Sequence, residues 1–243
     1  MATELKLTLK QIHWSLVAKA GFLGLAWAYF PFLIFLSLAL FFYFFPFFKS
    51  FKFLFPFLLF LVLISPGLAD KSFWLAFLIA FIFYMIFGVK DLLFIKRRSS
   101  YEAAIFGIAL ILFWVFFSQV QDWLGVGMIL GSFGVAIILF FLFLNVTQYD
   151  EFFKTKEVRV DGFRKSLIAG FLSFWIWQLI WVMVFLPFSP FYRSVMLFIV
   201  AWFLMEAMLS YLRGELNRRK ILINFTVLFC FTVFILASTD FGL

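Results

Sequence analysis

Long runs of apolar residues without a charge constrain this chain more than any other feature. The segments 22–45, 53–69, 103–117 and 124–144 contain no charged residue. A helix needs about 20 apolar residues to cross the hydrocarbon core of a bilayer. Several such runs in 243 residues, of which 66% are hydrophobic and 13% charged, leave little room for a soluble domain. The sequence predicts an all-α polytopic transmembrane helix bundle that forms a single transmembrane domain over 1–243.

Eight segments are predicted to cross the membrane. Aromatic residues such as Trp74, Trp123 and Tyr149 mark several of their ends, as interfacial aromatic belts do. Phenylalanine, with 44 copies, is abundant in these apolar segments and suits both lipid-facing and helix-packing positions. The predicted spans are 22–45, 53–69, 73–89, 103–120, 124–144, 167–186, 192–211 and 221–238.

The distribution of Lys and Arg predicts the orientation of these spans. In the eight-span topology, 15 of the 20 basic residues fall on one side. Because cytoplasmic loops carry the excess of Lys and Arg, both termini are predicted outside and the loops after the third, fifth and seventh spans inside. The longest of these is the polar cytoplasmic loop 145–166. The expected location is the plasma membrane.

The N-terminal residues 1–20 suggest an alternative topology. Their leucines recur on one helical stripe while their lysines and His13 share a neighbouring face, which predicts an amphipathic interfacial segment. The apolar run that follows is too long for the core of a cleavable signal peptide. Lysines prefer the cytoplasmic surface, so the alternative has seven crossings and an internal N-terminus, with 21–48 broken at Pro31 and Pro46 into a re-entrant hairpin.

A weak internal duplication points to a 4+4 tandem repeat. The second predicted span closes at Pro66 and the sixth at Pro187, 121 residues later. The third span runs into 96–98 and the seventh into 217–219, again 121 residues apart. Parallel repeats are known in membrane carriers, although apolar segments often resemble one another in sequence by chance.

Small residues at a spacing of four predict close helix contacts. Gly127 and Gly131 lie one turn apart on the fifth predicted span, and Ala103 and Gly107 do the same on the fourth. Such stripes let helix backbones approach where no hydrophobic force drives association. We therefore predict that these two stripes pack against each other.

Several chemistries are excluded by what the sequence lacks. His13 is the only histidine, so paired haem ligands and a Ser–His nucleophile pair within the bundle are excluded. Cys230 is the only cysteine, so no His and Cys cluster for zinc exists. The last span carries no lysine for a retinal Schiff base, and no phosphate-binding loop is present. We expect no cofactor, and no nucleic-acid partner despite the net charge of +8.

A few polar residues at membrane depth remain as site candidates. Glu206 lies within the seventh span, where a charge is costly and indicates a functional site unless an interfacial residue such as Arg164, Lys165 or Arg213 pairs with it. Gln178 lies beside Trp177 and Trp181, which share one helix face and could stack on a planar or cationic ligand. Interhelical hydrogen bonding is the commoner role of such amides. The candidate intramembrane site is Glu206, Gln178, Trp177, Trp181 and Asn224.

Two further groups lie at span ends. Asp70, Asp122 and Asp240 fall on the predicted outer face, where paired carboxylates could bind a cation or act as acid and base, or cap helices. The basic residues on the inner face should contact anionic lipid headgroups at about 1 kcal/mol each, or an acidic partner. These basic residues are Lys96, Arg97, Arg98, Arg218, Arg219 and Lys220.

Three functional hypotheses follow. The first is a non-enzymatic scaffold, assembly or accessory membrane subunit that contacts a protein partner or a second copy, because converging polar residues are scarce. The second is a small permease with Glu206 and Gln178 along its path. The third is an intramembrane enzyme acting on a lipid, with the outer aspartates as acid and base.

Overall fold

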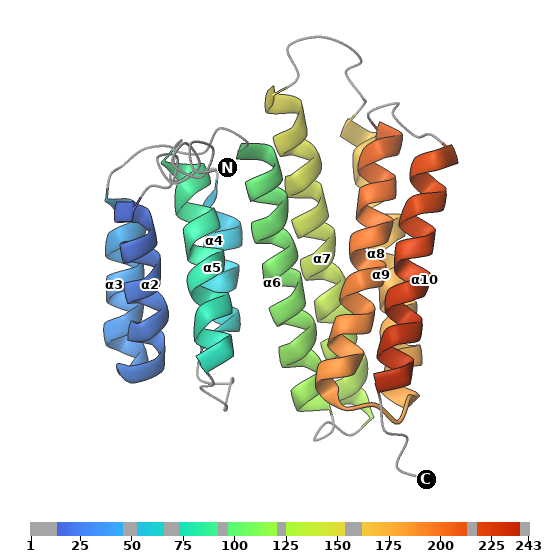
Figure 1. Ribbon diagram of the computed structural model, residues 1–243, viewed down its shortest axis with the longest axis horizontal. Helices are drawn as coiled ribbons and strands as arrows, with labels where there is room; N and C mark the ends of the chain where they lie inside the picture. Colours follow the sequence, from blue (N-terminus) through green and yellow to red (C-terminus); the bar gives the residue numbers. More distant parts are fainter. Residues whose placement is uncertain are drawn as a thin grey trace, which may run out of the picture. The chain divides into compact units, whose positions relative to one another are not determined.

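The structure is a set of α-helices joined by short connections. A computed structural model describes residues 14–45, 53–65, 73–91, 97–120, 125–153, 162–212 and 218–238, and no strand occurs among them. The helices are α2 Trp14–Tyr29, α3 Phe32–Phe44, α4 Leu54–Leu63, α5 Phe73–Lys90, α6 Arg97–Gln119, α7 Val126–Phe153, α8 Gly162–Phe185, α9 Pro190–Leu212 and α10 Arg218–Ser238 (Figure 1).

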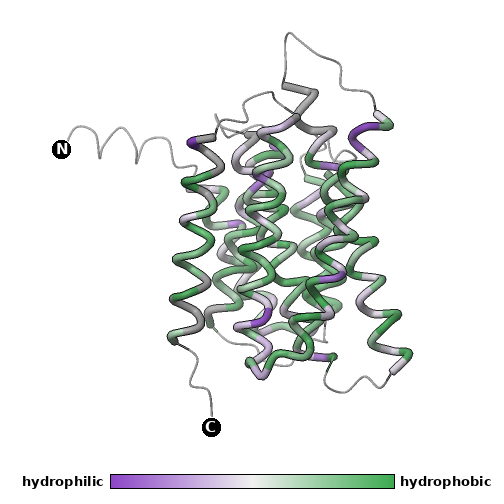
Figure 2. The backbone as a smooth tube through the Cα atoms, turned by 90° about the vertical axis from the view of Figure 1, so that its right-hand side faces the viewer, coloured by the Kyte–Doolittle hydropathy of each residue, from purple (hydrophilic) through white to green (hydrophobic). Residues whose placement is uncertain are grey.

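Several of these helices have the length and composition of membrane spans. Most residues along the helices are hydrophobic (Figure 2). The predicted helical class is confirmed, and the apolar helices indicate a membrane protein. Within the described residues, four segments are long and apolar enough to cross a bilayer, namely Ser99–Gln119, Val126–Thr147, Gly162–Phe185 and Pro190–Tyr211.

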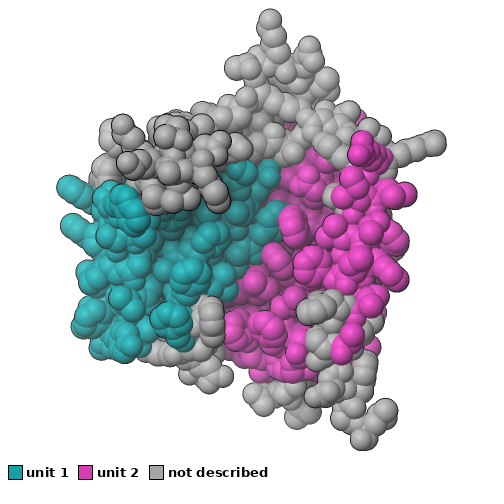
Figure 3. Space-filling view, in the orientation of Figure 1, with its two compact units in different colours: residues 1–108 teal, residues 109–243 magenta. Residues whose placement is uncertain are grey.

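The chain divides into two compact units (Figure 3). Unit 1 is Met1–Ile108 and unit 2 is Ala109–Leu243, so the division falls within α6. The predicted 4+4 repeat stays a prediction, and its proposed partners differ in length: α4 has 10 residues where α8 has 24.

Unit 1 begins with a helical hairpin, so the prediction of one continuous span over 22–45 is wrong. α2 ends at Tyr29 and α3 begins at Phe32. Pro31 lacks an N–H donor and disfavours helix in the residue before it, which ends α2, while its carbonyl oxygen accepts the first backbone hydrogen bonds of α3. The two helices lie side by side in opposite directions (Figure 1). The break at Pro31 required by the alternative topology is present, whereas Pro46 lies outside the described residues.

The helix α4 is shorter than the predicted span 53–69. Its 10 residues correspond to a length of about 15 Å, half of a bilayer core of about 30 Å. The indole Nε1 of Trp27 on α2 donates a buried hydrogen bond of 2.9 Å to the carbonyl oxygen of Ile64. This bond satisfies one of the carbonyl groups that the end of a helix leaves open. A specific contact with α2 therefore marks the end of α4.

Phenylalanine forms the core of unit 1. Phe57, Phe60 and Phe83 are fully buried, and the rings of Phe60 and Phe83 meet edge to face with centroids 5.0 Å apart. The Tyr43 ring stacks on Phe57 with centroids 3.9 Å apart and an angle of 14° between the planes. Aromatic pairs of this kind add about 0.5–1.5 kcal/mol to the area that they bury. Part of the high phenylalanine content is therefore explained by packing.

A close helix approach in unit 1 joins α2 to α5. A Cβ atom built on Gly24 would lie 2.8 Å from the carbonyl oxygen of Ala76 and 2.8 Å from the Cβ of Ala80. Only glycine fits at this position because one of these neighbours is backbone. Gly21, one turn earlier, has nothing within 4 Å of the same built atom. Small residues thus allow close packing here, as they do between membrane helices generally.

In unit 2, α7 continues beyond its apolar stretch. The helix ends at Phe153, so the loop predicted over 145–166 begins later than expected and α8 begins at Gly162. Asn145 donates a hydrogen bond to the carbonyl oxygen of Phe141 at 2.8 Å, and Thr147 bonds a carbonyl three residues earlier. Because both side chains donate hydrogen bonds to carbonyl oxygens of α7 itself, the helix can continue through these polar residues.

The turn between α8 and α9 is held by a cation. Arg193, whose residue surface is 9% exposed, donates from Nη2 to the carbonyl oxygen of Leu186 at 2.7 Å. Ser194 donates to the carbonyl oxygen of Pro190 at 2.6 Å. The side chain of Arg193 thus satisfies a carbonyl just beyond the end of α8 while its own backbone starts α9. A tight reversal places α8 and α9 side by side.

Candidate functional site

Glu206 lies on one face of α9 together with apolar residues. Val195, Ile199 and Trp202 precede it at steps of four, three and four residues, the spacing of one helical stripe. The stripe extends for about 16 Å along the helix from Val195 to Glu206. Glu206 itself is half-buried. A single carboxylate therefore ends an otherwise apolar face.

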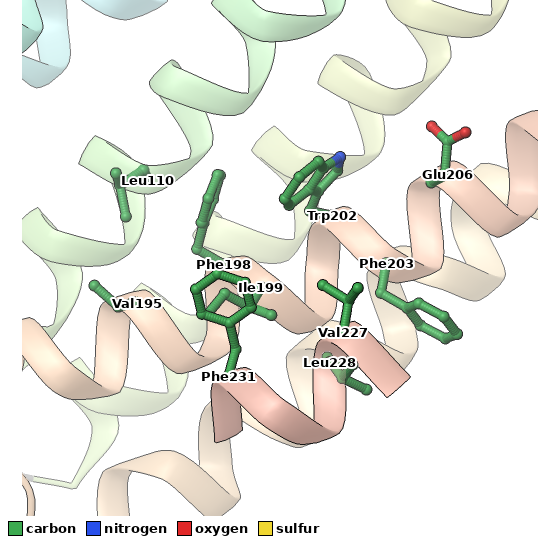
Figure 4. Close-up of a pocket in the computed structure, with 10 residues that line it drawn as sticks. All are labelled: Leu110, Val195, Phe198, Ile199, Trp202, Phe203, Glu206, Val227, Leu228 and Phe231. Atoms are coloured by element: carbon green, nitrogen blue, oxygen red, sulfur yellow. The ribbon is translucent and has the colours of Figure 1, made fainter. Parts of the chain in front are cut away.

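This face of α9 lines a pocket within unit 2. The pocket has a volume of about 630 Å³. Trp202 is 46% exposed and Phe231 on α10 is 49% exposed, so the opening lies on the side of these two residues. In the close-up, Glu206 stands at one end of the group, and Leu110 and Val195 stand at the other (Figure 4). The lining residues are Leu110 of α6, Val195, Phe198, Ile199, Trp202, Phe203 and Glu206 of α9, and Val227, Leu228 and Phe231 of α10.

Glu206 has no protein counter-charge in the part of the chain that the structure describes. No ion pair or hydrogen bond of its carboxylate occurs there. The predicted interfacial partner Arg164 instead donates to the hydroxyl of Tyr211 and lies over its ring at 5.4 Å from the centroid. Arg213 lies outside the described residues. An acid beside an apolar cavity without a cation is costly, which makes Glu206 the strongest site candidate.

The other members of the predicted intramembrane site are not gathered around Glu206. Gln178 is exposed on α8, and it does not line the pocket. Trp177 donates from Nε1 to the Oγ of Ser132 on α7 at 3.1 Å, so its polar atom holds two helices together. Trp181 is half-buried on α8. Asn224 belongs to α10, but its side chain lies outside the described part of the molecule.

The predicted outer-face cluster cannot be placed by the structure. Asp70, Asp122 and Asp240 all lie outside the described residues. Among the residues that are described, no three His, Cys, Asp or Glu side chains come together as a metal site would require. The cation-binding and acid–base readings of the three aspartates remain predictions.

The predicted headgroup contacts lie mainly at the beginnings of helices. Arg97 and Arg98 begin α6, and Arg218, Arg219 and Lys220 begin α10. Lys96 lies outside the described residues, and of these side chains only Arg219 is described, as exposed. The positive end of the helix dipole disfavours cations in a first turn. Helix stability therefore does not account for these positions.

The structure gives the packing neighbours of one half of the predicted glycine contact. A Cβ atom built on Gly107 would lie 2.8 Å and 2.9 Å from side-chain atoms of Ile82 on α5, so Gly107 packs closely within unit 1. Gly127 is exposed and Gly131 half-buried, and both belong to unit 2. Ala103 is half-buried. The pairing of the two stripes stays a prediction.

Sequence reasoning missed the buried cation of unit 1. Lys90 directly follows the predicted span 73–89, a position that indicates a loop, yet it is 0% exposed and its Nζ lies 2.6 Å from the carbonyl oxygen of Tyr43 and 2.9 Å from Oδ1 of Asp91. A signal was present, since Lys90 and Asp91 form an adjacent pair of opposite charges at the end of an apolar run. Such a pair can be buried together.

Comparison with known proteins does not extend this description. No family model matches the chain, and neither the curated proteins nor the solved structures include a significant match.

Proposed function

We propose that the chain is a multi-pass membrane protein of the plasma membrane that acts as a non-enzymatic scaffold, assembly or accessory subunit. The observation that carries this proposal is the use of polar side chains to support the fold. Intramembrane enzymes and carriers need several polar groups that converge on one site. In the described helices, by contrast, serine and threonine hydroxyls bond carbonyls of their own helix, as Ser37, Ser118, Ser173 and Thr226 do.

Three longer polar side chains also bond backbone carbonyls, in these cases on a neighbouring segment. Trp27 bonds the carbonyl oxygen after α4, Lys90 the carbonyl oxygen of Tyr43, and Arg193 a carbonyl after α8. Each therefore joins two helices and is not directed toward a shared cavity. An architecture in which polar groups fasten helices suits a protein whose role is to present helix faces and loops to partners.

We further propose seven crossings with an internal N-terminus, in which α2 and α3 form a re-entrant hairpin and the whole predicted span 53–69, of which α4 is a part, makes the first crossing. The break at Pro31 supports this topology over the eight crossings predicted first. The hairpin returns the chain to the side on which it began (Figure 1). In the proposed topology Lys6, Lys10 and Lys19 are on the cytoplasmic side with most other basic residues, in agreement with the positive-inside rule.

The basic beginnings of helices supply the proposed surface contacts. Cations in the first turns of α6 and α10 are unfavourable for the helices, and a nearby anion offsets that cost. Anionic lipid headgroups at the cytoplasmic leaflet provide that charge, at about 1 kcal/mol for each Lys or Arg. An acidic segment of a protein partner is the alternative.

A complementation assay tests the scaffold role. A host strain that lacks the protein is grown under the condition in which it is impaired, and it receives Glu206→Gln, Gln178→Leu or Trp177→Phe. We expect growth near the wild-type level at normal abundance for all three variants. Gly24→Val serves as the control for a structural failure, because it should reduce abundance and growth together.

The pocket that contains Glu206 supports a carrier as the second candidate. Glu206→Gln then removes the titratable group of the path, and growth should be lost while abundance stays normal. That result would replace the scaffold role with transport. The lipid-modifying enzyme depends on Asp70, Asp122 and Asp240 and has no support from the described residues.

A further inference from the structure

The pocket between α9 and α10 has the dimensions and chemistry of a ligand site. Its volume of about 630 Å³ lies within the usual range of about 300–1,000 Å³ for small-molecule pockets. Nine of its lining residues are apolar or aromatic, and Glu206 provides a carboxylate at one end (Figure 4). A ligand that fits this arrangement has an apolar chain and one cationic head.

The charge of Glu206 decides which head the ligand carries. Its carboxylate has no cation opposite it among the described residues, and it borders an apolar cavity. A primary ammonium group both neutralises a carboxylate and donates hydrogen bonds to it, whereas a quaternary ammonium has no N–H to donate. Trp202, one turn before Glu206, offers an aromatic face that also attracts a cation. A primary amine is therefore favoured.

The position of the pocket decides where such a ligand comes from. Trp202, Val227 and Phe231 are each more than 40% exposed, so the pocket opens sideways between two apolar helices. In a membrane this opening faces acyl chains. Glu206 lies six residues, or about 9 Å, before the end of α9 at Leu212, within reach of the headgroup region.

We propose that this pocket binds a membrane lipid with a primary ammonium headgroup, such as a phosphatidylethanolamine. The acyl chain lies along Val195, Ile199 and Trp202, and the ammonium pairs with Glu206. The inference requires the proposed membrane location but not the scaffold role, because a bound lipid is compatible with a scaffold, a carrier or an enzyme.

Quenching of Trp202 by brominated lipids tests the proposal. The purified protein is placed in nanodiscs of phosphatidylcholine in which one fifth of the lipid is replaced by a brominated-chain phosphatidylethanolamine, phosphatidylcholine or phosphatidylglycerol. Bromine quenches tryptophan on contact, and the share of Trp202 among the nine tryptophans is obtained by subtracting the signal of Trp202→Phe. We expect quenching of Trp202 by the ethanolamine lipid to be about three- to fivefold stronger, the upper part of the range for an exposed ion pair.

Three variants test whether the preference belongs to the pocket. Glu206→Gln should make the three headgroups equal, whereas Glu102→Gln on α6, which removes an acid outside the pocket, should leave the preference intact. Val195→Trp fills the opposite end of the pocket and should reduce binding of the ethanolamine lipid with Glu206 in place. Native mass spectrometry of the same samples counts retained lipid, so a variant that folds poorly is recognised by its mass distribution and charge states.

Three outcomes would overturn the proposal. Equal quenching by all three lipids in the wild-type protein would show that the pocket binds acyl chains without selecting among headgroups. A preference that survives Glu206→Gln would place the recognition elsewhere. Absence of quenching by any lipid, together with a dimeric mass, would assign the pocket to a helix of a second copy. The complementation result for the scaffold role is independent of each.

Discussion

The ammonium group of Lys90 donates a hydrogen bond to the carbonyl oxygen of Tyr43 across 2.6 Å, and so fastens the end of α5 to the end of α3. Lys90 is fully buried, and its Nζ lies 2.9 Å from Oδ1 of Asp91 and 5.4 Å from the centre of the Tyr43 ring. A carbonyl, a carboxylate and a ring face thus surround one cation. Burial of that cation is tolerated because its charge is compensated.

Replacement of this cation should destabilise unit 1. Lys90→Met keeps most of the side-chain volume but leaves the Tyr43 carbonyl and the Asp91 carboxylate without their partner. Loss of a hydrogen bond to a charged group costs about 2 kcal/mol, which corresponds to a Tm lower by about 4–8 °C for a chain of this size. Thermal unfolding in detergent measures the change. The double variant Lys90→Met/Asp91→Asn should recover part of the loss, and an unchanged Tm for Lys90→Met would contradict the assigned role.

Gly24 and Gly21 provide a matched pair for the contact between α2 and α5. Alanine normally stabilises a helix by up to about 1 kcal/mol relative to glycine. At Gly24, however, the new methyl group meets backbone at 2.8 Å, and overpacking of this kind costs about 1–3 kcal/mol. Gly24→Ala should therefore lower the Tm, while Gly21→Ala, with open space around it, should leave it unchanged or raise it slightly. Equal effects of the two variants would refute this contact.

The bond between Trp177 and Ser132 should contribute measurably to the contact of α7 with α8. Trp177→Phe keeps an aromatic ring but removes the donor, and it should cost about 1 kcal/mol, or about 2–4 °C in Tm. Ser132→Ala should cost a similar amount because it leaves the indole N–H of Trp177 without an acceptor. The double variant should cost less than the sum of the two. Trp175→Phe, at an exposed position of the same helix, is the control and should have little effect.

The sequence predicted what depends on local pattern. Apolar runs gave the helices, and the proline at position 31 marked the break that separates α2 from α3. The polarity of 145–153 suggested a loop, but Asn145 and Thr147 bond within α7, a choice that composition does not reveal. Glu206 was identified as a costly charge within an apolar segment.

Features that depend on which helices meet could not be predicted. The same small-residue spacing occurs around Gly24 and around Gly127, and only the placement of α5 shows that the first forms a close contact. The pocket at Glu206 requires three helices to be placed, and its aromatic lining looks in the sequence like any other apolar stretch. Lys90 resembled a loop residue until the end of α3 was located beside it.

Labelling of introduced cysteines decides between seven and eight crossings. Cys230 is exposed, so it is first replaced by alanine. Single cysteines are then placed at the exposed residues Ser15 in α2, Ser99 in α6 and Ser189 between α8 and α9, and intact cells receive a membrane-impermeant thiol reagent. If α2 and α3 form a hairpin with an internal N-terminus, Ser15→Cys and Ser99→Cys should be protected and Ser189→Cys labelled. All three should react after the membrane is permeabilised, which controls for accessibility. Labelling of Ser15→Cys in intact cells would restore eight crossings, and labelling of Ser99→Cys with protection of Ser189→Cys would invert the orientation.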